Sequence, residues 1–397
     1  NSANYRPPGP EHLADAPLLV RFYLGRPFAA FASLSLLISA GLLVGSTLVL
    51  RRVGRGEAGW LRRFRRLLGL AVAEGGERRR KPREVWQNPI AWREAHTRGR
   101  VLSGLLARWG FAALALLAGV ALVALYHFNR LPAVPGPTGQ PLPAHQVFHA
   151  ALLVLLLLEV AVVVLVAIYM SAGSVSRERE DGTLDLILAT PMTPRYYIWG
   201  KLRGLVSFLT LLMAVPVFTV ALASLYALVG YGLGWEKATF LHSAWGAGQA
   251  RITHRPLLML PEAAVLVAVV LTPFVALCVA AGMTWSLRAR SILGAVVPTV
   301  ISMGLLTLVM SFCGLNAVQG VRIIGPIISA FSPVTSMVMI VDPWAYVDGF
   351  AEDPALGRLS LVVGALIAAG GYSFIVYAMI QSMVRGFDHT VRRLSGA

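Results

Sequence analysis

Long apolar stretches separated by short polar segments run along most of the chain. Seven of them are long enough to cross a bilayer, which takes about twenty residues of helix. This pattern predicts an all-α, polytopic integral membrane protein. The predicted spans are residues 28–50, 102–127, 148–172, 203–232, 262–286, 292–313 and 359–384.

An eighth apolar stretch, residues 321–341, is interrupted by Pro326 and Pro333. Proline ends or kinks a helix, so the uninterrupted pieces are too short to cross. We expect two short helices or a re-entrant hairpin on one face of the membrane.

Composition strengthens the membrane interpretation. Only 14% of the 397 residues are charged, 56% are hydrophobic and the mean hydropathy is +0.68, whereas soluble domains carry about a quarter charged residues. The net charge is +16, but the basic residues cluster beside the predicted spans, which argues against nucleic acid as a partner. Two cysteines, Cys278 and Cys313, are too few for a disulfide framework.

The basic clusters also predict the orientation, because basic loops stay in the cytoplasm. With the arginine-rich linker 51–83 placed inside, alternation of the spans puts the N-terminus outside and the C-terminus inside. The loops 127–146 and 234–255 are then external, and the segments 176–201 and 286–291 internal. The chain starts at Asn1 without a signal-peptide pattern, so we expect a processed product or a piece of a longer protein.

Just before the second predicted span, the linker contains "EVWQNPIAWRE". Asn88 and Pro89 form a reasonable N-cap and first helical residue. Aromatic residues with arginine at the foot of a span are typical of a helix lying in the interface plane. The alternative is an ordinary polar linker. The predicted interfacial helix includes Trp86, Pro89, Trp92, Arg93 and Glu94.

The segment "SREREDGTLDLILATPMTPRYYIWGK", residues 176–201, has six formal charges in its first ten residues and lies between two apolar spans. Gly182 ends one helix, Thr183 can cap the next, and Pro191 and Pro194 stop it. So short a helix is unstable alone, and we expect it to dock into a partner through its leucines. The alternative is a solvated loop.

The residues "ERE", "GTL", "TP" and "GK" at this spacing resemble the coupling-helix region of ABC-2 type exporter permeases, a family that includes sodium-efflux and copper- or nitrous-oxide-associated permeases. Weaker matches follow in the same order: "NPIAWRE", "SLRARS", "FSPVT" and "RGFDHTVRR". Together they cover roughly residues 85–395.

This resemblance implies a six-span permease unit over residues 86–397, in the bacterial cytoplasmic (inner) membrane. Its partners would be an ABC-type ATPase subunit, which binds ATP and Mg²⁺, and a second permease half in a homodimer or pseudo-dimer. By the same resemblance, the ATPase-coupling interface would comprise Arg177, Glu178, Arg179, Glu180, Gly182, Thr183, Leu184, Asp185, Leu186 and Leu188.

Residues 1–85 add a span that one permease half does not need. Like the last span, the first follows Gly-Arg and ends in a basic run. Our hypothesis is that it is the tail of an upstream permease half; the alternative is coincidence between two apolar helices with basic ends.

Sequence signatures of catalysis are missing. A phosphate-binding loop needs Gly-x₄-Gly-Lys-Ser/Thr, but Gly200-Lys201 is followed by Leu202 and preceded by Arg195 in place of the first glycine. HExxH and GxSxG are also absent, so we expect no enzyme activity, cofactor or metal site in this chain. We expect the loop histidines to be solvated, with metal binding as the alternative; they are His127, His145, His149, His242 and His254.

Glu159 is an acid deep inside a predicted span. A charge there costs at least about 2.5–3.5 kcal/mol on insertion scales, so its side chain should face protein or a water-filled cavity. We expect it to hydrogen-bond a neighbouring helix; contact with a cationic substrate and proton relay are the alternatives. For the whole chain, we expect an export permease, the alternatives being a membrane scaffold or assembly factor and an ion-driven secondary transporter.

Overall fold

The structure is a computed structural model. It describes residues 102–135, 141–184, 192–234, 257–320, 324–347, 350 and 353–395, and five isolated residues, Ser33, Leu36, Ala40, Ile90 and Ala91. The chain divides into two units, Asn1–Arg83 and Glu84–Ala397, and nearly all described residues belong to the second.

Two predicted elements fall largely outside the described residues. Of the first predicted span, 28–50, only Ser33, Leu36 and Ala40 are described, and they are helical. Ile90 and Ala91 of the predicted interfacial helix are helical and buried. Its five named residues lie outside the described part, namely Trp86, Pro89, Trp92, Arg93 and Glu94.

The described residues form helices and no strand. Six helices are long and apolar enough to cross a membrane, and they coincide with the second to seventh predicted spans. Such a set is typical of an integral membrane protein. These helices are α5 (Leu102–His127), α6 (Ala144–Glu180), α8 (Pro194–Leu233), α9 (Ala263–Arg288), α10 (Ile292–Gly320) and α14 (Pro354–Ser395).

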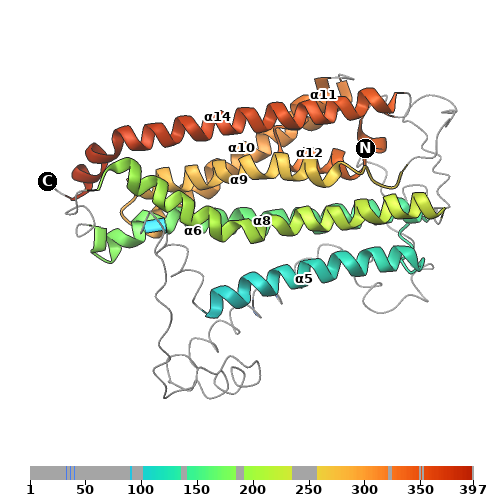
Figure 1. Cartoon of the computed structure of the whole chain (residues 1–397), viewed down its shortest axis with the longest axis horizontal. Coiled ribbons are helices and arrows are strands. Elements are labelled where there is room, and N and C mark those ends of the chain that lie inside the picture. Colours follow the sequence, from blue (N-terminus) through green and yellow to red (C-terminus); the bar gives the residue numbers. More distant parts are fainter. Residues whose placement is uncertain are drawn as a thin grey trace, which may run out of the picture. The chain divides into compact units, whose positions relative to one another are not determined.

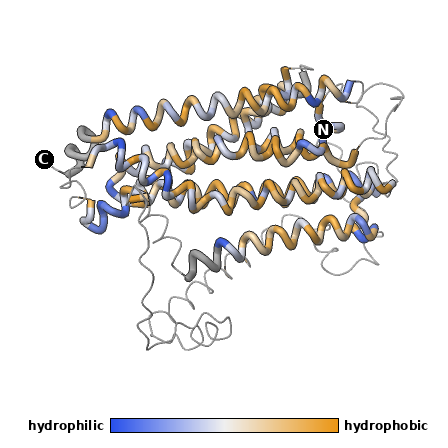
Figure 2. The backbone as a smooth tube through the Cα atoms, in the orientation of Figure 1, coloured by the Kyte–Doolittle hydropathy of each residue, from blue (hydrophilic) through white to orange (hydrophobic). Residues whose placement is uncertain are grey.

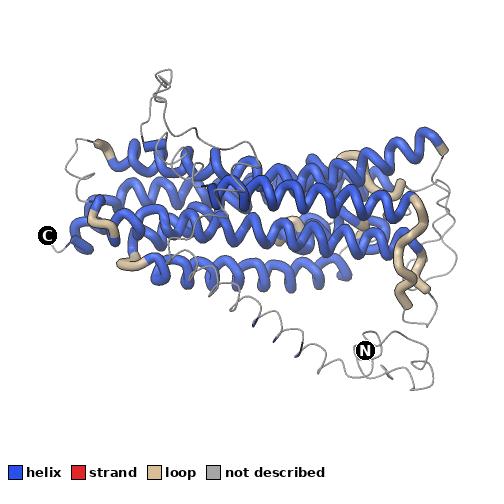
Figure 3. The backbone as a smooth tube through the Cα atoms, turned by 90° about the horizontal axis from the view of Figure 1, so that it is seen from below, coloured by secondary structure: helices blue, strands red, loops and turns tan. Residues whose placement is uncertain are grey.

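The long helices lie side by side (Figures 1 and 3). Their apolar residues occupy the middle of each helix, and hydrophilic residues gather near the ends (Figure 2). Helix α6 has 37 residues and α8 has 40. At 1.5 Å per residue, each is longer than the roughly 30 Å hydrocarbon layer, so both extend beyond the apolar stretch that the hydropathy pattern identified.

Helix α9 is at the centre of the bundle and packs against α6, α8, α10, α12 and α14. In its most apolar window 61% of residues are buried, against 17% in α10. A glycine permits close packing of α9 against α6: a Cβ at Gly282 would lie 2.0 Å from Ser171 Oγ and 3.0 Å from the backbone nitrogen of Ala172. Small residues allow membrane helices to approach at this distance.

The stretch 321–341 forms two short helices, α11 (Ile324–Ser329) and α12 (Pro333–Val341), as predicted. Ser332 caps α12 by accepting a hydrogen bond from the Thr335 backbone, and Pro333 is the first helical residue. The turn between them is held by α14, where the Tyr372 hydroxyl donates to the carbonyl of Phe331. Helix α13 (Pro343–Tyr346) follows, capped by Asp342.

The helix ends form two groups. At one end, which we call the α6–α8 end, the C-terminus of α6 contacts the N-termini of α8 and α10 and the C-terminus of α9. The opposite end holds the N-terminus of α6 and the Asp342 turn, which His149 brings together. Figure 1 shows the same division.

Candidate functional site

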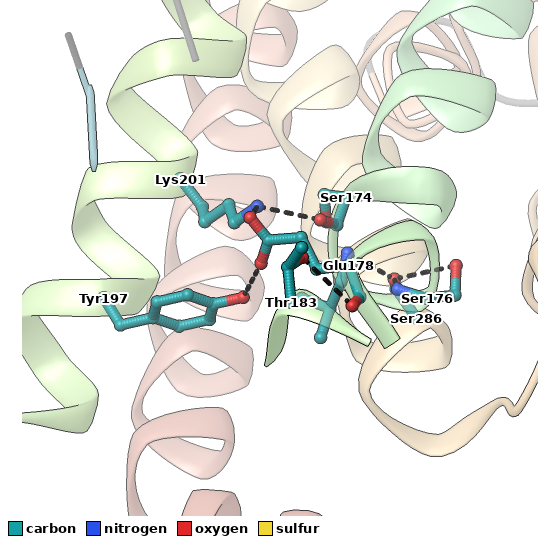
Figure 4. A network of polar contacts seen from close by, with 8 residues as sticks. Ser174, Ser176, Glu178, Thr183, Tyr197, Lys201 and Ser286 are labelled. Carbon is teal, nitrogen blue, oxygen red and sulfur yellow. Dashed lines mark hydrogen bonds and ion pairs between the residues drawn. The ribbon is translucent and has the colours of Figure 1, made fainter. Parts of the chain in front are cut away.

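A buried ion pair joins the last turn of α6 to the first turns of α8 (Figure 4). Lys201 Nζ lies 2.7 Å from Glu178 Oε1, and it also donates to the carbonyl of Ser174 at 2.8 Å. The Tyr197 hydroxyl donates to the second carboxylate oxygen, Glu178 Oε2, at 2.6 Å. Both carboxylate oxygens of Glu178 are therefore paired.

This pair is removed from solvent. Lys201 is fully buried, and Glu178 is 9% exposed. Burying two charges is costly unless their geometry is good and their other polar positions are satisfied. Here two hydrogen bonds satisfy the remaining polar positions of the pair. Separating α6 from α8 would therefore leave a buried, unpaired charge on each helix.

A second polar contact lies on the other side of α6. Ser286 Oγ of α9 accepts from the backbone nitrogens of Val175, at 3.0 Å, and Ser176, at 2.9 Å. It lies one turn beyond Gly282, where α9 comes closest to α6. A side chain inserted into a helix's hydrogen-bond ladder is a recognised cause of local bending. The last turns of α6 are thus held by α9 as well as by α8.

The two charged residues after Glu178 bind the turn between α9 and α10. Arg179 donates to the backbone carbonyls of Ala289 and, at 3.2 Å, of Leu287. Glu180 Oε1 accepts from the backbone nitrogen of Ile292 at 2.9 Å, at the start of α10. Cations at a helix C-terminus and anions at an N-terminus are both favourable. The run of charges therefore links α6 to three neighbouring helices.

Beyond these charges the chain leaves α6 as predicted. Gly182 has a φ of 68°, a left-handed conformation that glycine adopts without strain at a helix C-terminus. Thr183 was predicted to cap the following helix; its hydroxyl donates to the carbonyl of Glu178 at 3.2 Å and so satisfies the end of α6. Leu184 is 3% exposed and belongs to the main hydrophobic core.

The structure places the predicted coupling residues as follows. Glu178 and Leu184 are buried, whereas Arg179 and Glu180 bind the α9–α10 turn. Arg177 bends back to Tyr169, donating to its hydroxyl at 3.2 Å. Gly182 and Thr183 are exposed. Asp185, Leu186 and Leu188 lie outside the described residues, and the role of the whole set in ATPase binding stays a prediction.

The sequence analysis missed Tyr197, Lys201 and Ser286 as members of this network. In the sequence, Lys201 is part of the "GK" match to the permease family and of a false phosphate-binding signature. Its location carried a usable signal: a lysine two residues before an apolar span, with a glutamate six residues after the previous predicted span. Ser286 carried no such signal, because a serine at the end of an apolar helix is common.

Glu159 does hydrogen-bond a neighbouring helix, as predicted. Thr219 of α8 donates to Glu159 Oε1 at 2.9 Å, and the glutamate is 2% exposed. Its other oxygen, Oε2, is buried and has no hydrogen-bond partner among the residues that the structure describes. One polar contact thus links α6 to α8 in the apolar middle of the bundle, and half of the carboxyl group is unsatisfied.

The expectation of a solvated His149 is wrong. His149 lies in the first turns of α6 and is 5% exposed. Its Nε2 donates to the carbonyl of Leu258 at 2.8 Å, and its Nδ1 lies 3.3 Å from Asp342 Oδ2. His149 was grouped with the loop histidines although it lies inside the predicted span 148–172, and contacts with residues distant in the chain bury it. Its contacts join α6 to the α12–α13 turn.

No cluster of three or more possible metal ligands occurs among the described residues. Comparison of the sequence with protein-family models and with curated proteins gave no match. A function for this chain is therefore inferred from its residues, their contacts and the resemblance of the 176–201 segment.

Proposed function

We propose that this chain is the membrane-spanning permease component of an ATP-driven ABC-2 type export system, coupled to a separate ATPase through the segment 176–195. The resemblance of that segment supplies the family. One observation in the structure supports mechanical coupling through this segment: the buried Glu178–Lys201 pair links the helices on either side of it.

The pair lies at the two flanks of the segment. Glu178 precedes Gly182, where α6 ends, and Lys201 follows Thr193, which caps α8. A displacement of the residues between these flanks is therefore transmitted to α6 and α8 as a unit. The contacts of Arg179, Glu180 and Ser286 would transmit the same displacement to α9 and α10.

Rigid-body switching requires such a connection, because a force applied to a loose loop would be absorbed by the loop. In the proposed cycle, ATP binding closes the ATPase pair beneath the membrane. The docked segment moves with it, and the linked helices rearrange to open a path to the other side. The ATPase supplies the energy; this chain converts its movement.

The first test is association with an ATPase. We expect the chain, purified from its native membrane, to carry a protein that hydrolyses ATP. Leu186→Asp should abolish this activity by placing a charge where an apolar anchor is expected, since interface anchors each contribute about 2 kcal/mol or more. Asn129→Asp, at the opposite end of the bundle, is the control and should retain it.

Circular dichroism establishes that both variants keep their helix content. The proposal fails if no ATP-hydrolysing protein accompanies the chain in any preparation. It also fails if Leu186→Asp and Asn129→Asp retain equal ATPase activity.

An ion-driven secondary transporter is the second candidate, and Glu159 is the observation that favours it. A buried carboxyl with one unpaired oxygen is the kind of group that carries protons or cations in such transporters. Transport by the purified chain in vesicles with an imposed ion gradient and no ATP would support this candidate over the export permease.

A further inference from the structure

The first turns of α8 present a polar and aromatic surface outside the buried network. Thr193, Arg195, Tyr196 and Trp199 line an open, shallow cavity of about 350 Å³. Arg195 is exposed, as are the rings of Tyr196 and Trp199. The Thr193 hydroxyl caps the helix, so the arginine and the two rings are the groups that face a ligand.

This surface continues into the outward face of the span. Trp199, Arg203, Val206 and Thr210 follow one another at helical spacing of four, three and four residues, and all are exposed. The same helix exposes Phe218 and Leu225 further along. One face of α8 thus passes from cationic and aromatic residues to apolar residues over about two turns.

This order of residues along α8, cationic and aromatic first and apolar after, matches the headgroup and acyl chains of one phospholipid molecule. Tryptophan and tyrosine favour the level of the headgroups, where one edge of the ring is apolar and the other is wet. Arginine binds phosphate through two parallel N–H groups. The apolar residues below lie where the acyl chains would run.

The surrounding charge selects the class of lipid. Among the described residues at the α6–α8 end, the exposed basic residues include Arg195, Arg203, Arg288 and Arg290. Of the acidic residues described there, Glu178 is paired in the core, Glu180 binds the start of α10, and Asp181 is exposed, so basic residues outnumber the exposed acids. A net negative headgroup is therefore attracted to this face more strongly than a zwitterionic one.

We propose that the Arg195–Tyr196–Trp199 cavity is a binding site for the headgroup of an anionic phospholipid, whose acyl chains lie along the Val206 face of α8. The guanidinium of Arg195 binds the phosphate, and Trp199 and Tyr196 hold the headgroup at the interface. Occupancy would stabilise the first turns of α8, directly beside the buried Lys201. The site does not depend on the proposed transport function.

Quenching of tryptophan fluorescence by brominated lipids tests this site. The chain, which has nine tryptophans, is purified in detergent and titrated with brominated phosphatidylglycerol or brominated phosphatidylcholine. Lipid-facing tryptophans elsewhere, such as Trp109, respond to either lipid. We expect additional quenching by the anionic lipid, and we expect Trp199→Phe to remove most of that difference.

The arginine is tested with a matched control. Arg195→Gln should weaken the apparent affinity for brominated phosphatidylglycerol about fivefold, the effect of removing one basic residue near an anionic surface. Arg130→Gln changes an exposed arginine at the opposite end of the bundle and should leave the affinity unchanged. Helix content by circular dichroism establishes that both variants fold.

Three results would overturn the proposal. Equal quenching by the two lipids would remove the anionic preference and point instead to a protein partner on this face. An unchanged affinity in Arg195→Gln would place the phosphate elsewhere. Competition by millimolar inorganic phosphate that abolishes the anionic excess would assign the cavity to free phosphate and not to a lipid.

Discussion

Individual charged residues in this protein are held by partners on other helices, and Lys201 is the clearest case. Its ammonium group is fully buried against Glu178. Lys201→Met should destabilise the chain by about 3–5 kcal/mol, because it leaves a carboxylate buried without its cation. Denaturant unfolding of the detergent-purified protein measures this.

The double variant Lys201→Met/Glu178→Gln should recover most of that loss. It removes both charges and keeps an oxygen to accept from Tyr197. Arg290→Gln, an exposed position at the same end, should change stability by less than about 0.5 kcal/mol. A Lys201→Met protein as stable as this control would contradict the importance of the pair.

Two conservative substitutions test the hydrogen bond between Thr219 and Glu159. Glu159→Gln keeps the oxygen that accepts from Thr219, so we expect normal folding. Thr219→Val keeps the shape but removes the donor, and should cost about 1–3 kcal/mol because the buried carboxyl loses its hydrogen bond. Thermal unfolding in detergent compares the two. Transport lost in Glu159→Gln with the ATPase still coupled would instead favour direct substrate contact.

At the scale of helices, the α6–α9 contact depends on Gly282. A methyl group there would meet Ser171 Oγ at 2.0 Å, and Ser171 Cβ and the Ala172 backbone nitrogen at 3.0 Å. The hydroxyl can rotate away but the other two atoms cannot, so the helices must move apart by a few tenths of an ångström. We expect Gly282→Ala to destabilise the protein by about 1–3 kcal/mol, the usual cost of overpacking. Separation would also displace Ser286 from the α6 backbone and so weaken the link that the proposed cycle uses.

Gly304 of α10 is the matched control. In the described part of the chain, no atom beyond the neighbouring backbone of α10 itself lies within 4 Å of a Cβ built there. Gly304→Ala should therefore stabilise the helix by about 0.5–1 kcal/mol through the lower entropy of the unfolded chain. Calorimetric or denaturant unfolding should move the two variants in opposite directions. If both are stabilised, the Gly282 contact is not close.

For the whole molecule, the sequence predicts an orientation that cysteine labelling can test. Cys278 and Cys313 are first replaced by alanine. Asn129→Cys, in the loop after α5, should react with a membrane-impermeant maleimide on intact cells. Ser291→Cys, between α9 and α10, should react only after permeabilisation, because the α6–α8 end is predicted to be cytoplasmic. The reverse pattern would place the coupling segment outside and contradict the proposed function.

The existence of six of the predicted spans and of the two short helices at 324–341 could be read from the sequence. Hydropathy reports whether a segment is more stable in hydrocarbon than in water, and proline and glycine report where a helix must stop. For this reason the helix breaks at Gly182 and Pro333 were predicted correctly. Both signals are local, so no knowledge of neighbours was needed.

Helix ends were less predictable. Helix α6 starts at Ala144 and ends at Glu180, beyond the predicted span 148–172 on both sides. The extension at its end places Glu178 in the helix, where it meets Lys201. Polar residues can continue a helix outside the hydrocarbon when tertiary contacts satisfy them. Hydropathy has no information about those contacts.

By itself, then, the sequence determined a bundle of apolar helices with a charged segment between two of them. Only the tertiary structure decided which charges face each other. Glu178 meets Lys201, and Ser286 meets an α6 backbone that is 110 residues away along the chain. In a membrane protein, lipid-facing and protein-facing surfaces are both apolar, so the pattern along one helix does not identify the helix it packs against.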